Sequence, residues 1–399
     1  METQVISNAG TLDPFIWERL AHPSLYLSSN WLRARSRTIK GAERFVLVTG
    51  VEGCPLVGVP AYLIGSSSHP GFNPARVLAI DDLTDAEIES VPGAIDALAE
   101  LRGMLRQRGG EWTPSLVVST PGRYGGISYG TGIAADAAHS ALVAAVEAVE
   151  RQARADEARS ICWLYFAEDE DPLLAATLHE RGYLSVVVDA ECYLPLRWDD
   201  FQGYLSSFPA RYRYKIRHEM AAFDKAGGDV ELRGGEALGP DLAQLELKWR
   251  EKYGRTPPLA DIIADYENLR SYLMPNLRVF VATLRGRTVG FTLFLQHEDI
   301  WYARFGGFDY SVGNLFLYFN LLFYRPIQFF VERGVRLVHY SLKSYQAKAS
   351  RGCLLKNVIA YVRPPEGWTH VGDLLEIVDR AQRFRFDTIM SRRSMRGPA

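Results

Sequence analysis

Cysteine is scarce in this sequence, and histidine nowhere clusters. Cys54, Cys162, Cys192 and Cys353 show neither the paired spacing of a metal site nor the framework of a disulfide-stapled fold. The eight histidines stand singly, without HxxxH or HxH spacing. We therefore expect no metal site. Because Cys162 and Cys192 stand in apolar runs, buried free thiols in a reducing cytoplasm are the natural interpretation.

Long apolar runs are also missing. The first residues lack the basic start and apolar core of a secretory signal. No run reaches the roughly 18 apolar residues of a membrane span, because Asn320, Arg325 and Pro326 interrupt the nearest candidate at 315–330. We expect a cytoplasmic protein with no membrane span and a buried helix in that segment.

Neither sign of charge dominates. The chain has 45 Lys and Arg against 47 Asp and Glu, so its formal net charge of −2 neither favours nor excludes a polyanionic partner. Its 47% hydrophobic and 23% charged residues are typical of globular proteins, which excludes a disordered or collagen-like chain. At roughly 150 residues per domain, 399 residues predict two or three domains.

Hydrophobic patterning predicts mixed strands and helices in both halves. The first half has a hairpin, helical segments and strands over 44–65, 84–108, 115–120, 160–166, 171–182 and 183–196, with a long helix ending near 158. The second half has helices, a hairpin and strands over 210–226, 240–273, 277–299, 314–334 and 335–343. Pro326 is expected to bend the helix at 314–334.

One short comparison indicates an internal repeat. Arg123–Tyr129 (RYGGISY) aligns with Arg304–Tyr310 (RFGGFDY), and four of the seven positions are identical. Each window follows a strand and precedes a long helix, which favours duplication. Two similar turns that independently need glycine are the alternative.

The paired glycines also predict an anion site. A loop with free backbone amides at the N-terminus of a helix favours phosphate. Neither window has Walker A or GxGxxG spacing, so a sharp strand-to-helix turn is the other interpretation.

Three segments carry a family resemblance: FPARYRYKIRHEMAAFDKAGG at 208–228, the run at 303–342, and SYQAKASRGCLLKN at 344–357. They resemble the Fem-type aminoacyltransferases and related proteins of the GNAT acyltransferase superfamily, most strongly over 201–364. The resemblance implies a mixed α/β (α+β) fold class with two tandem GNAT-like lobes, each a mixed sheet flanked by helices. The expected boundaries are 1–198 and 199–399, the second lobe holding a basic entry helix and a C-terminal tail.

The resemblance also implies acyl transfer to an amine. In GNAT enzymes a bulge splays two neighbouring strands, and backbone donors there bind the acyl donor. The amine attacks the carbonyl directly, an amide N–H stabilises the oxyanion and a side chain or water accepts the proton. No tightly bound cofactor is implied. Acyl-CoA or aminoacyl-tRNA would be the co-substrate, a small amine-bearing molecule the acceptor, and tRNA a partner.

Donor-binding positions follow from the GNAT pyrophosphate pattern, Gln/Arg-x-x-Gly-x-Gly/Ala. The pattern maps onto 123–128 and 304–309, where Arg123, Gly126, Arg304 and Gly307 match its first and fourth positions. The expected donor-binding residues of these windows are Arg123, Gly125, Gly126, Arg304, Gly306 and Gly307. In the second lobe Asp309 replaces the final small residue, and a carboxylate would repel a pyrophosphate. Either the first lobe binds a CoA-like donor, or the donor is bound in the Fem manner.

Basic residues of the second lobe offer further donor contacts. Arg211 and Lys215 share one face of a predicted helix that could contact phosphates of tRNA or of a diphosphate, or be a solvated surface. Lys348 and Arg351 are also candidates for anion contacts. The basic run at 380–396 is expected to be a frayed helix and a solvated tail, with nucleic-acid contact as the alternative.

Candidate catalytic residues lie at strand and loop ends of the second lobe: Asp309, Tyr310, His339, Tyr340 and Lys343. His339 and Lys343 share one face of the predicted strand, and Tyr340 lies on the other. A single histidine in an apolar strand is equally interpretable as a satisfied core residue.

A second class of function also fits: a non-catalytic tandem-GNAT binding module for a peptide or glycan fragment, which the degenerate pyrophosphate loops favour. The substitution Gly307→Val is expected to abolish transfer at a modest cost in stability, since a side chain would fill space that the donor needs.

Overall fold

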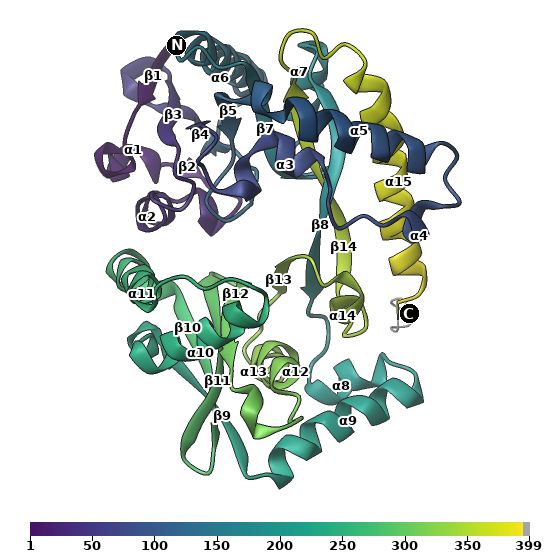
Figure 1. The fold of residues 1–399 in the computed structure, drawn as a ribbon. Helices are drawn as coiled ribbons and strands as arrows, with labels where there is room; N and C mark the ends of the chain where they lie inside the picture. Colours follow the sequence, from purple (N-terminus) through teal and green to yellow (C-terminus); the bar gives the residue numbers. More distant parts are fainter. Residues whose placement is uncertain (394–399) are drawn as a thin grey trace. The chain divides into compact units, whose positions relative to one another are not determined.

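The computed structural model describes residues 1–393 and divides the chain into two compact units (Figure 1). Unit 1 comprises 1–190 and 356–388, and unit 2 comprises 191–355 and 389–393. The unit boundaries fall inside β8 (Leu184–Pro195), β14 (Leu354–Arg363) and α15 (Val371–Ser391). The structure thus differs from the expected division, because the segment 356–388 belongs with the first half of the chain.

The sheet of unit 1 is antiparallel except at one pair. Its strands are β1 (Glu2–Ile6), β3 (Ala42–Thr49), β4 (Pro55–Ile64), β5 (Ser115–Val118), β7 (Ser160–Ala167) and β14. β5 and β7 are parallel, and all other neighbours in this series are antiparallel. The short strands β2 (Leu20–Ala21) and β6 (Ser128–Gly130) pair with each other, and β6 also pairs with β4. Because β14 pairs with β7, the second segment of the chain completes this sheet.

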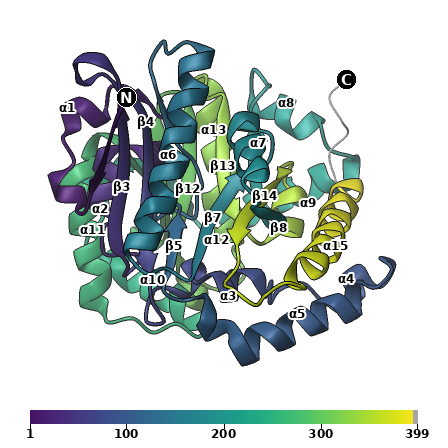
Figure 2. The same cartoon turned by 90° about the horizontal axis from the view of Figure 1, so that it is seen from above.

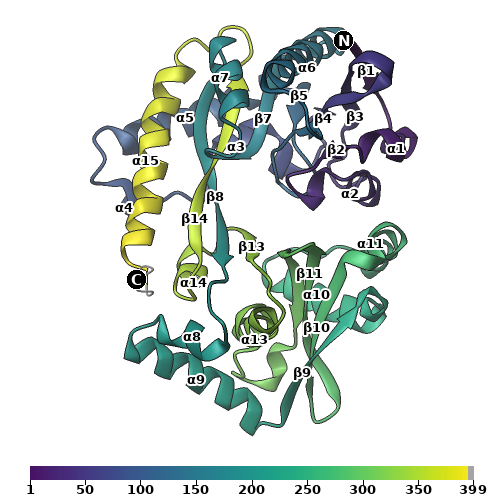
Figure 3. The ribbon, with the colours of Figure 1, turned by 180° about the vertical axis from the view of Figure 1, so that it is seen from behind.

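Helices cover the sheet of unit 1. The long helix α6 (Ala135–Ala155) packs on β1, β3 and β4 (Figure 2). The helix α15 runs beside β8 and β14 (Figure 3), where Asp379 accepts a hydrogen bond from the Val187 amide at 2.7 Å. The remaining helices are α1 (Pro14–Trp17), α2 (Ser29–Ala34), α3 (Pro74–Leu78), α4 (Asp85–Ile88), α5 (Ala94–Arg108) and α7 (Pro172–Glu180).

Unit 2 repeats the strand pattern of unit 1. The strands β9 (Gly228–Gly234), β10 (Leu277–Leu284), β11 (Arg287–His297) and β12 (Ile300–Phe308) are antiparallel in that order. β13 (Leu337–Leu342) is parallel to β12 and antiparallel to the end of β8. The predicted mixed α/β fold class is therefore confirmed. Duplication of the sequence stays a prediction.

The two faces of this second sheet carry different helices. Gly307 faces α10 (Pro240–Lys252), because a Cβ atom there would lie 2.4 Å from the Glu246 nitrogen. Gly290 faces the opposite way, with a Cβ position 2.9 Å from Leu321 Cδ1. The remaining helices of this unit are α8 (Phe201–Ser206), α9 (Ala210–Lys225), α11 (Leu259–Leu273), α12 (Leu317–Phe319), α13 (Arg325–Glu332) and α14 (Tyr345–Ala349).

A π-helix over Asn320–Tyr324 joins α12 to α13. Pro326 has no N–H for the carbonyl of Leu322, so the α-helical pattern fails at this point. The Arg325 amide instead donates to the Asn320 carbonyl, five residues back. In place of a simple bend at Pro326, the helix has one π-helical turn just before this proline.

Candidate active site

Pairing between β12 and β13 stops partway along both strands. Tyr302 and His339 form the last pair, although β12 continues to Phe308 and β13 to Leu342. Just beyond this pair Arg304 is an extra residue in β12 with no counterpart on β11. A bulge next to two separating strands is the arrangement that the GNAT resemblance implied. It leaves the backbone of β12 beyond Tyr302 unpaired with β13.

His339 lies at the point where these strands separate. Its Nδ1 is 2.7 Å from Glu191 Oε1 of β8, and its ring stacks on Tyr302 with centroids 4.8 Å apart. A carboxylate that accepts the Nδ1–H fixes the tautomer whose Nε2 carries the lone pair. The side chain of His339 is 14% exposed, so it is not fully enclosed by the protein. Glu191 was not predicted, although a carboxylate in the apolar run around it was a usable signal.

A left-handed turn follows β13. Ser341, Lys343 and Ser344 have φ of 60°, 65° and 55°. Lys348 Nζ donates to the carbonyls of Tyr340, Ser341 and Leu342 at 2.6, 3.1 and 2.9 Å. All three N–H bonds of the ammonium are used, so Lys348 stabilises the turn. The structure differs here from the predicted contact with a donor anion.

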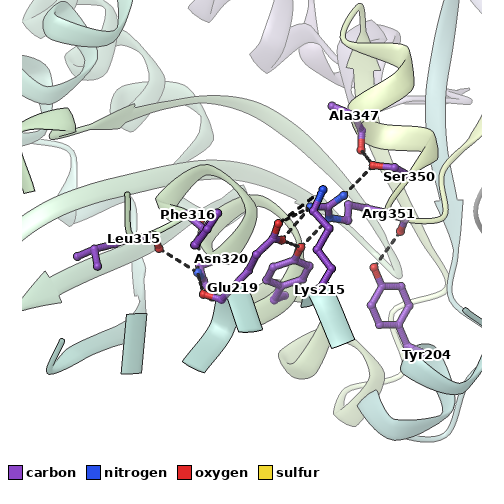
Figure 4. Close-up of polar contacts among 10 residues, drawn as sticks. Tyr204, Lys215, Glu219, Leu315, Phe316, Asn320, Ala347, Ser350 and Arg351 are labelled. Atoms are coloured by element: carbon purple, nitrogen blue, oxygen red, sulfur yellow. Dashed lines mark hydrogen bonds and ion pairs between the residues drawn. The ribbon is translucent and has the colours of Figure 1, made fainter. Parts of the chain in front are cut away.

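Arg351 lies in a buried cluster (Figure 4). Its Nη2 donates to both Glu219 oxygens at 3.1 and 2.8 Å, and its Nε donates to the Tyr324 hydroxyl at 2.6 Å. Nη1 donates to Ser350 Oγ at 2.7 Å, and the Arg351 carbonyl accepts from Tyr204. Burial alone would lower the pKa of Arg351, but Tyr324 and Glu219 outweigh it and raise that pKa. Arg351 is therefore neutralised internally rather than presented to a donor phosphate.

The basic helix α9 leaves its own charges at the surface. Lys215 Nζ lies 3.9 Å from Glu219 Oε1, yet 55% of its side chain is exposed (Figure 4). Arg211 is exposed and donates to the Tyr212 hydroxyl at 3.1 Å. Because Arg351 already compensates Glu219, the charge of Lys215 remains to be balanced by solvent or a ligand.

Asn320 ties this helix to the connection between β12 and α12. Its Nδ2 donates to the carbonyls of Glu219, Leu315 and Phe316 at 3.2, 3.3 and 3.3 Å (Figure 4). The connection spans 309–316 and contains Gly313 with φ of 85° and open space at its Cβ position. The sequence prediction placed the pyrophosphate pattern at RFGGFD, whose first five residues lie in β12, and it named only Asp309 and Tyr310 of this connection.

The second glycine pair lies inside a strand rather than in a loop. A Cβ at Gly306 would lie 2.4 Å from the Phe291 carbonyl oxygen, and one at Gly307 would meet the α10 backbone. These glycines permit close packing of strand on strand and of helix on strand. They form no anion cradle, and Gly307→Val would be expected to disrupt the packing of α10.

The first glycine pair is also engaged in structure. The Gly125 amide donates to the Tyr165 carbonyl at 2.7 Å. A Cβ at Gly126 would lie 2.8 Å from Tyr124 Cε1, and the Arg123 guanidinium packs against Gly71. The helix α6 begins only at Ala135, so this window does not form the helix N-terminus that the anion prediction required.

Two of the other candidates for catalysis lie around the same connection. Asp309 accepts hydrogen bonds from the Ser311 amide and hydroxyl at 3.0 and 2.6 Å, and these bonds lower its pKa. Tyr310 is 45% exposed, with Lys252 Nζ 3.8 Å from its ring centroid. A carboxylate whose pKa is lowered is a poor proton acceptor, so Asp309 is better suited to holding the turn.

The last two candidates follow His339 along the chain. Tyr340 is buried and stacks on Phe323 with centroids 4.5 Å apart, and burial raises its pKa. Lys343 Nζ lies 5.9 Å from the Tyr345 ring centroid. The structure thus brings His339 together with Glu191 and Tyr302.

Residues 1–393 contain neither a cluster of metal ligands nor a membrane-spanning helix. No group of three His, Cys, Asp or Glu in this part of the chain could hold a metal ion. No helix in it combines the length and apolar character needed to cross a bilayer.

The sheet order, the bulge at Arg304 and the separating strands define a GNAT-type fold. A family model described as peptidoglycan biosynthesis/recognition, FemAB-like, matches residues 101–361, which is more than half of the chain. The chain therefore belongs to the FemAB-like family. No curated protein sequence matches it significantly.

Solved structures show the same fold at low sequence identity. The crystal structure of FemX has a TM-score of 0.56 at 13% identity, covering 90% of this chain and 97% of its own. L-PGS from Bacillus licheniformis has a TM-score of 0.48 at 12% identity, covering 85% and 90%. A tandem GNAT protein from the clavulanic acid biosynthesis pathway has 0.46 at 13%, covering 91% and 98%. Of these three, FemX has the highest TM-score, and only its similarity is used here. At 13% identity that similarity supports the fold alone.

Proposed function

We propose that this chain is an N-acyltransferase that forms an amide on an amine-bearing acceptor in unit 2. The observation that carries the proposal is the His339–Glu191 pair at the residue where β12 and β13 part, beside the bulge at Arg304. Membership of the FemAB-like family supports it. The family description makes a peptidoglycan precursor one class of acceptor to test.

The proposed reaction needs only groups that this arrangement supplies. The acceptor nitrogen forms a bond to the donor carbonyl carbon, and the bond from that carbon to the ester or thioester leaving atom breaks. His339 Nε2 takes the proton that the nitrogen loses, while Glu191 stabilises the imidazolium through Nδ1. Backbone N–H groups of β12 beyond Tyr302 would stabilise the oxyanion. The leaving alkoxide or thiolate then takes up a proton.

An aminoacyl-tRNA is the donor that we favour over acyl-CoA. Between Ala210 and His218 the helix α9 carries four Lys or Arg residues and no acidic one. Arg211 and Lys215 are exposed there, and Asn320 holds α9 against the 309–316 connection. Phosphate contacts from such a face position a nucleic acid without reading its sequence.

Mass spectrometry of reactions with a panel of amines tests the proposal, with acetyl-CoA or a mixture of charged tRNAs as donor. We expect amide product with charged tRNA, and a loss of about 10²-fold or more in kcat/KM for His339→Gln. Glu191→Gln should lower the rate less and move the pH profile. His297→Gln in β11 is the matched control and should leave the rate unchanged.

The remaining outcomes separate the alternatives. Product from acetyl-CoA alone would replace the tRNA donor but keep the transferase. If neither donor is consumed with any amine, the transferase proposal fails. Stabilisation of the protein by a peptide or glycan fragment alone would then favour a binding module. Full activity of His339→Gln would remove His339 from the mechanism.

A further inference from the structure

A cavity of about 660 Å³ lies within unit 1, and the acyl-transfer proposal makes no use of it. It opens at the connection between β7 and α7, beside β6, β14 and α15. Its volume falls in the range of pockets for small molecules. Its apolar area comes from side chains that include Ile127, Leu173 and Ile359.

Four consecutive carboxylates line this cavity: Glu168, Asp169, Glu170 and Asp171. Arg383 pairs with Glu168 at 2.6 Å, and Lys356 pairs with Glu170 at 3.2 Å. Asp171 caps α7 by accepting from the Leu174 amide at 2.9 Å. Asp169 has no ion pair with any residue in 1–393, so the wall keeps a negative excess.

Aromatic side chains form another part of the wall. Tyr124, Tyr129, Phe166 and Tyr361 line the cavity, and the Tyr129 hydroxyl donates to Asp171 Oδ2 at 2.8 Å. Burial, followed by the charges of Glu168, Asp171 and Asp169, raises the pKa of Tyr361 to about 12. The ring of Tyr361 therefore lies near three of the four carboxylates.

A buried histidine also borders the cavity. The side chain of His22 is 8% exposed, and its Nδ1 lies 2.7 Å from Ser128 Oγ. Its Nε2 has no hydrogen-bond partner with acceptable geometry within residues 1–393, although Glu18 Oε2 lies 3.3 Å away. Glu18 is the charge partner of this ring, and His22 is one of the causes that lower the pKa of Glu18 to about 2.

We infer that this cavity binds a small organic cation, an alkylammonium group carried on a ligand of about amino-acid size. Carboxylates compensate the charge of an ammonium, and electron-rich ring faces attract it. The carboxylates exclude anions, even though the cavity lies at the N-terminus of α7. Because they hold an amine in its protonated form, the bound group is one that the protein recognises and not one that attacks a carbonyl.

Binding of matched five-carbon probes to the full chain tests the inference without any acyl donor, so its result is independent of the acyl-transfer proposal. The probes are 1-aminopentane, 1-pentanol and pentanoate, measured by saturation-transfer NMR at neutral pH and low salt. We expect 1-aminopentane to bind and to weaken as salt is added, while 1-pentanol binds at least about fivefold more weakly and pentanoate not at all.

The substitution Asp169→Asn supplies the decisive variant. Asp169 has φ of 64°, and asparagine adopts this left-handed region readily, so folding should be unaffected. We expect about fivefold weaker binding of 1-aminopentane, the effect of losing one exposed charge. Glu180→Gln, at the other end of α7, is the control. Equal binding of amine and alcohol, or unchanged affinity in Asp169→Asn, would overturn the inference.

Discussion

Gly307 has no space for a side chain, because the backbone of α10 packs directly against it. The Leu245 and Glu246 backbone of α10 would lie within 2.4 Å of a Cβ atom there. We expect Gly307→Ala to lower the free energy of unfolding by more than about 3 kcal/mol, because neither strand nor helix can move aside cheaply. Gly313→Ala has open space but φ of 85°, so it should cost only about 1 kcal/mol. Urea denaturation compares the two, and equal losses would contradict the packing argument.

Arg351 and Glu219 form a buried pair whose partners depend on each other. Both side chains are 2% exposed. Removing Arg351 leaves the Glu219 carboxylate buried without its main charge partner. Arg351→Met should therefore lower the free energy of unfolding by about 3–5 kcal/mol. The double variant Glu219→Leu, Arg351→Met should recover much of that loss, since no charge is left buried. A double variant that is as unstable as the sum of the two singles would refute this account.

Glu150 makes stability depend on pH. Burial raises its pKa, but hydrogen bonds and charge from Arg181 and Arg363 outweigh burial and lower it below the usual 4.5. A lowered pKa stabilises the folded state above 4.5 and loses that contribution as pH falls toward the folded value. We expect the urea midpoint to fall as the pH is lowered below 4.5, and to fall less steeply in Glu150→Gln. If the urea midpoint depends on pH in the same way in the unmodified protein and in Glu150→Gln, Glu150 is not a source of the pH dependence.

At the scale of elements, Lys348 links α14 to the end of β13. Its ammonium is bonded to three carbonyls of the strand and the turn. Lys348→Met would leave these acceptors without a charged donor, at a cost of about 2–3 kcal/mol. Hydrogen exchange of the amides in 340–344 should speed up. Exposed Lys225 of α9 provides the control in Lys225→Met, and the same exchange rates in both variants would show that Lys348 is dispensable.

Helices and strands could be predicted where residues close in the sequence cause them. The hairpins, the helix α6 and the basic helix α9 follow from periodicity and turn residues, and the structure confirms them. The family resemblance implied a bulge and Pro326 a bend, but periodicity could neither place the bulge at Arg304 nor give the bend its π-helical form. His339 was identifiable from sequence, while its partner Glu191 is 148 residues away.

On the scale of the whole molecule, unit 1 needs the far end of the chain. Val358 and Val362 of β14 pair with Ala167 and Cys162 of β7, and Arg385 of α15 bonds to Glu87 at 2.9 Å. A fragment of residues 1–198 lacks these elements and should fail to give a cooperative thermal transition. Adding a fragment of residues 199–399 should restore one. Cooperative unfolding of 1–198 alone would contradict this dependence.

The sequence by itself determined the mixed α/β class, the order of its strands and helices, and the family to which the chain belongs. Those features rest on periodicity, turn residues and local motifs, all of which lie within short stretches of chain. Only the tertiary structure decided that Lys348 and Arg351 hold the fold together, that both glycine pairs serve packing, and that His339 stands beside Glu191. These outcomes depend on which distant groups compete for the same donors and the same space, and no local pattern records that competition.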